Sequence, residues 1–210
     1  MAIKLAMTVA FLMLASRQTS AATRESGDAR RLAIMTPAQF QARATLQDDD
    51  LDTIATITTA DGFVERRPLL GLAPDDVFLR AFIDKKTGRA AYQVYATMRY
   101  RGYGWADWRV ANYATPTGPR SIPTRRIARL RVSCSRSLPC PRSETIGFSV
   151  SAALLKDNAA LYSAETITSW RFKILARDGQ KRNLLLSTAE IAGMLMAVEA
   201  YRTDRHLPNF

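Results

Sequence analysis

Aromatic and arginine side chains alternate over one short stretch of the chain, from Tyr100 to Arg109. Exposed aromatic rings stack on sugars, and guanidinium groups form bidentate contacts with phosphate or carboxylate. The pattern therefore indicates a surface that recognises an acidic glycan or a lipid headgroup. The alternative is that Tyr100, Trp105 and Trp108 are core residues bracketing a tight turn. That alternative is favoured for the tryptophans and leaves Tyr103 as an open case.

More arginines follow from Arg125 to Cys134, where apolar and basic residues alternate. Alternation of period two predicts a strand with one core-facing and one solvent-facing side. The residues expected to face the core are Ala128, Leu130, Val132 and Cys134, so that the other side presents a row of arginines. The residues predicted to bind a partner are Arg99, Arg101, Tyr103, Arg125, Arg129 and Arg131.

Positive charge is concentrated in the middle of the chain. The formal net charge is +11, and residues 85–142 hold thirteen lysines and arginines but a single acid, Asp107. A compositional bias explains why arginines outnumber lysines by 24 to 6, but it does not explain the loss of acids. A basic block is an argument about partners rather than about fold. The charge distribution alone does not distinguish a binding surface from a solvated face, and the two remain equal alternatives for the basic block.

Catalytic groups are sparse. His206 is the only histidine and lies near a polar chain end, where it is badly placed to activate a nucleophile. Gly102 and Gly104 lack the following Lys-Ser/Thr and the helix of a phosphate loop. Asp107 and Glu144 could cleave a glycosidic bond as a carboxylate pair. Because both lie among arginines, ion pairing is favoured over this hydrolase alternative; a structural or assembly subunit is a third hypothesis.

The two cysteines, Cys134 and Cys140, are separated by five residues and lie among prolines. In an exported chain this spacing predicts a disulfide that closes a short loop and stabilises it by about 2 kcal/mol. A structural zinc site would need four Cys or His ligands, which the sequence does not supply. The acidic residues 48–52 do not match a calcium loop and are interpreted as a solvated turn. No metal and no cofactor is expected.

The amino-terminal residues have the features of an export signal. Lys4 precedes an apolar run, Leu5–Ala15, that is too short for the roughly 20 residues of a spanning helix. We expect a signal peptide over 1–21, a flexible leader over 22–35, a single β-rich domain over 36–206 and a tail over 207–210. The mature protein is expected to be soluble, in the periplasm or secreted.

Export also narrows the choice of partner. Such a protein meets anionic lipids, acidic glycans and acidic proteins of the envelope before it meets nucleic acid. The expected function is therefore non-enzymatic binding of an anionic envelope component or an acidic protein, with a peripheral membrane contact among the alternatives. Nucleic acid is not expected as a partner, and the oligomeric state is not predicted.

Strand patterns fill most of the remaining chain. Strands are predicted at 77–84, 89–101, 108–114 and 145–150, with weaker signals at 40–47 and 52–59. Three prolines, Pro116, Pro119 and Pro123, predict a loop that breaks strand pairing. Ser151 is expected to cap a short helix that runs through Leu155.

The clearest unit lies near the end of the chain. The segments 169–177 and 180–186 flank Asp178-Gly179 and predict a hairpin. Ser187 and Glu190 fit a capping box for a helix over 188–202, with an apolar stripe through Ile191 and Val198. The predicted fold is mainly β (α+β): an antiparallel sandwich or sheet of about eight strands with a carboxy-terminal amphipathic helix packed on it.

Overall fold

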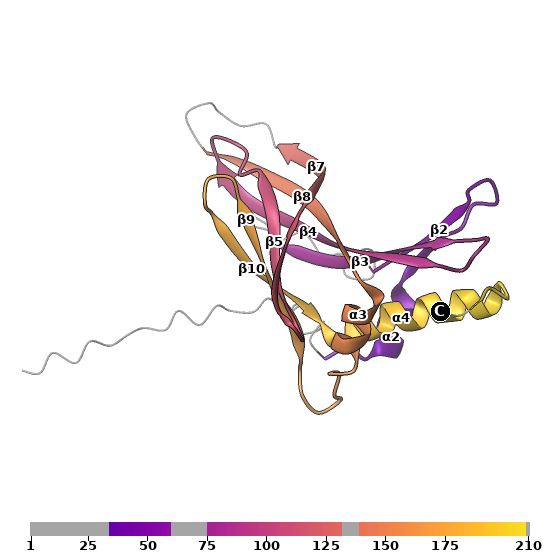
Figure 1. The fold of residues 1–210 in the computed structure, drawn as a ribbon. Coiled ribbons are helices and arrows are strands. Elements are labelled where there is room, and N and C mark those ends of the chain that lie inside the picture. The colour runs from indigo at the N-terminus through magenta and orange to yellow at the C-terminus, as the bar shows by residue number, and fades with distance from the viewer. Residues whose placement is uncertain (1–33, 60–74, 132–138, 209–210) are drawn as a thin grey trace, which may run out of the picture.

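The computed structural model describes residues 34–59, 75–131 and 139–208. The fold consists of two antiparallel sheets and three helices within these ranges (Figure 1). The helices are α2 (Pro37–Arg43), α3 (Ala152–Ala159) and α4 (Thr188–Asp204). The strands are β1 (Thr45–Gln47), β2 (Ile54–Thr58), β3 (Asp76–Asp84), β4 (Ala90–Gly102), β5 (Trp108–Thr115), β6 (Gly118–Pro123), β7 (Arg125–Arg131), β8 (Cys140–Val150), β9 (Ser169–Ala176) and β10 (Lys181–Ser187).

The larger sheet has the order β1-β2-β3-β4-β8-β7, and the smaller has the order β10-β9-β5-β6. The β3–β4 hairpin turns at Gly88, whose φ of 73° lies in the left-handed region that glycine adopts without strain. The β9–β10 hairpin turns at Gly179, with φ of 85°. The structure confirms the predicted hairpin at 169–186 and the two strands predicted at 77–84 and 89–101. Strand β7 is one edge of the larger sheet and β6 is one edge of the smaller sheet.

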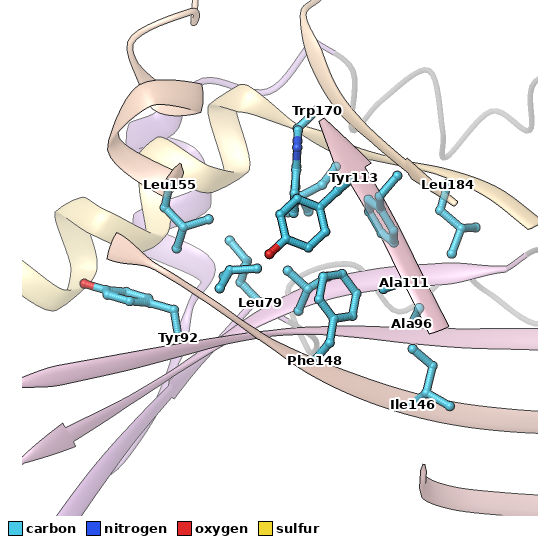
Figure 2. Close-up of a cluster of buried hydrophobic side chains, with 14 of the residues drawn as sticks. Leu79, Tyr92, Ala96, Ala111, Tyr113, Ile146, Phe148, Leu155, Trp170 and Leu184 are labelled. Carbon is cyan, nitrogen blue, oxygen red and sulfur yellow. The ribbon is translucent and has the colours of Figure 1, made fainter. Parts of the chain in front are cut away.

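The core lies between the two sheets and continues beneath α4. Tyr113 of the smaller sheet stacks on Phe148 of the larger one, with ring centroids 6.0 Å apart, and Trp170 packs edge-on against Tyr113 at 5.4 Å (Figure 2). At the other end of the larger sheet, Ile191 and Val198 of α4 join the same buried cluster. The structure thus confirms a mainly β fold with a packed carboxy-terminal helix, and it resolves the predicted alternatives in favour of two sheets.

The predicted strand at 40–47 is wrong over most of its length, because α2 occupies residues 37–43. Thr36 caps this helix and forms a reciprocal capping box with Gln39, and Pro37 stands at its first turn, where a missing N–H is harmless. Phe40 is fully buried and packs with Met35 and Ala189. Met35, assigned to the flexible leader, is therefore part of the packed structure.

The prediction that the prolines break strand pairing is also wrong. Strand β6 pairs with β5 throughout, with Pro119 opposite Ala114 and Pro123 opposite Val110. A proline is tolerated in an edge strand where its nitrogen faces away from the neighbouring strand, and the two prolines lie four residues apart, on the same side of the ladder. The chain then passes from the smaller sheet into β7 of the larger one at Thr124.

The predicted capping box of α4 forms only in part. The Ser187 side chain accepts a hydrogen bond from Ala189 N, but Glu190 does not return to the cap. Its Oε1 instead accepts a hydrogen bond of 2.5 Å from Thr59 Oγ1. The helices α3 and α4 otherwise begin where they were predicted.

Several expectations fall on residues outside the described ranges. The signal peptide over 1–21, nearly all of the leader and Cys134 are among them, so each remains a prediction. Cys140 begins β8, and the described part of the chain holds no free cysteine. None of its helices combines the length and apolar composition needed to cross a membrane.

Candidate anion-binding site

The predicted arginine row is divided between the two faces of the larger sheet. Strand β7 pairs with β8 through Arg125↔Gly147 and Arg129↔Glu144, with a bulge between Arg126 and Ala128. A bulge adds one residue and so reverses the face that later side chains occupy. Arg129 therefore points to the inner face and Arg125 to the outer one, although sequence alternation placed them together.

The same bulge explains why Leu130 is not in the core. It lies opposite Ser143 on the outer face and is 66% exposed. Ala128 is exposed as well. The predicted orientation of these two residues was therefore wrong, although the strand itself was predicted correctly. Val132 and Cys134 lie outside the described residues.

Arg129 is the centre of a charged network on the inner face. Its Nε donates to Glu144 Oε2 at 2.9 Å, and its terminal Nη2 donates to Asp107 Oδ1 at 3.1 Å. Arg109 contacts the other oxygen of Asp107, through Nε at 2.8 Å and Nη2 at 2.5 Å. One guanidinium thus bridges two carboxylates that lie 37 residues apart in sequence.

Glu144 is enclosed by this network, with 1% of its surface exposed. Its Oε1 accepts hydrogen bonds from the Tyr100 hydroxyl and from Asp107 N, the latter at 3.2 Å. Burial, followed by the hydrogen bond to Glu144, raises the pKa of Tyr100 to about 12. The hydrogen bond from Arg109 holds the pKa of Asp107 below its ordinary value.

This geometry does not favour the glycan-cleaving hypothesis. A glycosidase needs one protonated carboxyl and one that reaches the sugar or a water. Both oxygens of Glu144 are occupied inside the protein, Arg129 stands between the two groups, and Asp107 is held in its charged form. The pair is built as an ion-pair network, which agrees with the interpretation favoured from the sequence.

The network fixes the turn between β4 and β5. Arg142, 7% exposed, donates from Nε to the carbonyl of Gly102 at 2.9 Å and from Nη2 to that of Tyr103 at 2.7 Å. The Trp105 ring contacts two guanidiniums, with Arg142 Cζ at 4.7 Å and Arg129 Cζ at 5.0 Å from its centroid. These distances are within the range of cation–π attraction.

Two backbone contacts complete the turn. Ala106 N donates to the Tyr100 hydroxyl at 2.9 Å, and Arg177 N of the β9–β10 turn donates to Asp107 O at 3.0 Å. Asp107 itself has a φ of 59°, a left-handed conformation that aspartate tolerates better than most residues. The turn is therefore tied to both sheets.

The six predicted binding residues have different surroundings. Arg101, Arg125 and Arg131 are exposed, Arg99 is half-buried, and Arg129 is committed to the network. Tyr103, the open case, is 74% exposed at the turn, whereas Trp105 is 36% exposed and Trp108 is buried. The tryptophans therefore behave largely as structural residues.

Arg142 and Arg177 were not among the predicted binding residues. Arg142 lies outside the strand predicted at 145–150, but β8 begins at Cys140 and pairs Arg142 with Tyr100. Its signal was the alternation Arg142, Glu144, Ile146, which continues the buried face of the predicted strand. Arg177 reaches the site only through the packing of the two turns, for which the sequence carries no local signal.

The other candidate groups lie elsewhere. Asp48 accepts from Tyr201 and forms ion pairs with Lys85 and Arg205, at 2.5 and 2.7 Å, so this acid is paired inside the structure rather than solvated. His206 is exposed beyond α4. Over the described ranges, no cluster of three or more histidine, cysteine or acidic side chains could hold a metal ion.

Comparisons with protein-family models, with curated proteins and with solved structures return no match for this chain.

Proposed function

We propose that this protein is an exported, non-enzymatic envelope protein that binds an anionic partner through the exposed arginines of β7 and the end of β4, beside Tyr103. One observation carries the proposal. Arg101, Arg125 and Arg131 are exposed and form no ion pair within the described ranges, while the nearby acids are already paired with Arg129 and Arg109. Positive charge is left available to a partner.

The arginines of this region differ in their contacts, and this difference supports a binding role for the exposed ones. Arg142 holds the turn through backbone carbonyls, and Arg129 and Arg109 neutralise the acids of this region. The remaining arginines are not needed for those contacts. Uncompensated charge of one sign raises the local concentration of ligands of the opposite sign and steers their approach. Arginine is also suited to bidentate contact with phosphate and carboxylate.

The test is binding to dextran sulfate, a soluble polyanion, measured by isothermal titration calorimetry at several salt concentrations. We expect the binding constant to fall steeply with salt, because exposed charges are screened over about 10 Å at 0.1 M. We expect the triple variant Arg101→Gln/Arg125→Gln/Arg131→Gln to bind at least about tenfold more weakly, since each charge near an anionic surface contributes about 1 kcal/mol.

The matched control removes three exposed charges from other parts of the molecule: Arg171→Gln/Lys173→Gln/Lys156→Gln, in β9 and α3. It has the same net charge as the triple variant and should retain most of the binding. Equal loss in the two variants, or binding that does not respond to salt, would contradict the proposal.

A further inference from the structure

Four exposed residues lie at one end of the sandwich, and we call this set the tip: Arg101, Tyr103, Arg131 and Arg177. Arg101 lies one residue before the end of β4, and Arg131 ends β7 opposite Arg142. Arg142 holds the backbone of Tyr103, and Arg177 N is bonded to Asp107 O of the same turn. The β4–β5 and β9–β10 turns accordingly lie side by side, far from the carboxy-terminal end of α4 (Figure 1).

The tip arginines do not share a face of the sheet. Paired residues of neighbouring antiparallel strands project to the same face. Arg131 pairs with Arg142, which pairs in turn with the inward-facing Tyr100, so Arg131 lies on the inner face. Arg101 pairs with Pro141 on the outer face. A ligand lying along either face would reach only part of the set. A surface that meets the strands end-on reaches all of it.

Tyr103 is the apolar feature of the tip. Its ring is 74% exposed, although its backbone is held by Arg142 and its turn is fixed by Trp105 and Asp107. A rigid backbone presents the ring without a further loss of chain entropy on binding. Tyrosine suits the boundary between water and lipid, because its ring is apolar and its hydroxyl remains hydrated.

From this geometry we infer that the tip docks end-on on a lipid bilayer with anionic headgroups, with Tyr103 at the interface and the three arginines on the headgroups. The inference rests on the proposed anion binding and specifies its partner. A planar, negatively charged surface can contact the tip arginines on both faces of the sheet at once, together with the Tyr103 ring that lies at the same end. An acidic peptide or glycan strand would instead follow a single face or groove.

The experiment measures sedimentation with vesicles made of equal parts phosphatidylcholine and phosphatidylglycerol, and with vesicles of phosphatidylcholine alone. We expect binding only to the anionic vesicles. Arg101→Gln/Arg131→Gln should lower the partition coefficient by more than about tenfold, from roughly fivefold for each charge. Tyr103→Ala should lower it by several-fold as well, through lost burial of the ring.

The matched control is Lys156→Gln/Arg171→Gln, which removes two exposed positive charges away from the tip. Lys156 lies in α3, and Arg171 lies five residues before the end of β9 at Ala176, or about 16 Å at the rise of a strand. End-on docking requires this control to bind almost normally. If it loses as much binding as the tip variant, the vesicle contact is not confined to the tip and the inference is overturned.

A second measurement follows the environment of position 103 directly. In Tyr103→Trp, the emission of the new indole, taken as the difference from the unchanged protein, should shift to shorter wavelength on anionic vesicles. An unshifted emission from bound protein contradicts the inference. Binding to dextran sulfate without binding to vesicles would also overturn it, while leaving the proposed anion binding intact. Absence of binding to both probes would reject both.

Discussion

Arg129 shows how one side chain can be both a charge and a scaffold. It lies in an edge strand, but its guanidinium contacts two carboxylates and the face of Trp105. Glu144, its partner, has almost no contact with solvent. Burying two charges is unfavourable unless they are paired and hydrogen-bonded, so the network stabilises the fold only while every member is present.

Removal of Glu144 should therefore be strongly destabilising. In Glu144→Ala, Tyr100 Oη and Asp107 N lose their acceptor and Arg129 loses its more buried partner. We expect the free energy of unfolding to fall by about 3–5 kcal/mol, as measured by urea denaturation.

Arg109→Ala is the control at the exposed end of the same network, since 55% of the Arg109 side chain is open to solvent. Exposed ion pairs contribute about 0–1 kcal/mol, so the free energy of unfolding of this variant should differ little from that of the unchanged protein. Similar values for both variants would mean that burial of Glu144 has no energetic weight.

At this scale the sequence predicted the residue types of the site but not their directions. The pairing of Asp107 with arginine and the exposure of Tyr103 agree with interpretations that the sequence had offered. The inward turn of Arg129 could not be predicted, because it depends on a bulge that alternation alone does not reveal. An alternating pattern indicates a strand, but one extra residue changes the face.

Among the elements, the contact between α2 and α4 depends on a single missing side chain. A Cβ added at Gly193 of α4 would lie 2.5 Å from Phe40 Cβ and 2.7 Å from the carbonyl oxygen of Pro37. Both distances are shorter than van der Waals contact. Gly193 is needed because the backbones of the two helices approach closely. It lies within α4 and does not have a positive φ.

Gly193→Ala tests this close packing by the sign of its effect. Helix propensity alone predicts that alanine stabilises a helix interior by up to about 1 kcal/mol. Because α2 must move to accept the methyl group, we expect a net loss of about 1–3 kcal/mol in thermal or urea unfolding.

Gly104→Ala is the comparison, since nothing lies within 4 Å of a Cβ at that position. It should leave stability nearly unchanged. A stabilising effect of Gly193→Ala would show that α2 can shift freely and does not dock firmly on α4.

The elements that the sequence predicted well are those specified by local chemistry. Asp178-Gly179 and the apolar spacing of α4 each specify their element within a few residues. Helix α2 was missed because residues 40–47 have the composition of a strand, and the capping signal just before them, Thr36 with Gln39, was not used. Strand β6 was missed because two prolines count against a strand, unless it is known to lie at an edge.

For the whole molecule, two sets of carboxyls make stability depend on pH in opposite directions. The hydrogen bond from Lys85 lowers the pKa of Asp48, and the one from Arg109 lowers that of Asp107. Such groups stabilise the fold above their unfolded pKa, and this contribution is lost as the pH falls through their folded values. Glu190 acts in the opposite direction, since burial raises its pKa from 4.5 to about 8.

The Glu190 carboxyl should make the protein less stable as the pH rises. Below 4.5 the carboxyl is protonated in both folded and unfolded chains and has no effect. Between 4.5 and about 8 the unfolded chain releases its proton while the folded chain retains it, so stability falls by up to about 1.4 kcal/mol per pH unit. Above about 8 both states are ionised and the decrease ends.

Glu190→Gln should remove this slope and keep the hydrogen bond from Thr59, because the amide oxygen can still accept it. Urea unfolding across this pH range should give similar midpoints for the two proteins at the acid end and a higher midpoint for the variant at the alkaline end. The loss of stability at low pH, which arises from Asp48 and Asp107, should be the same in the two proteins. If the urea midpoints of the two proteins change with pH in parallel over the whole range, Glu190 is already ionised in the folded protein. Its carboxylate would then be hydrated despite its position between α4 and Thr59.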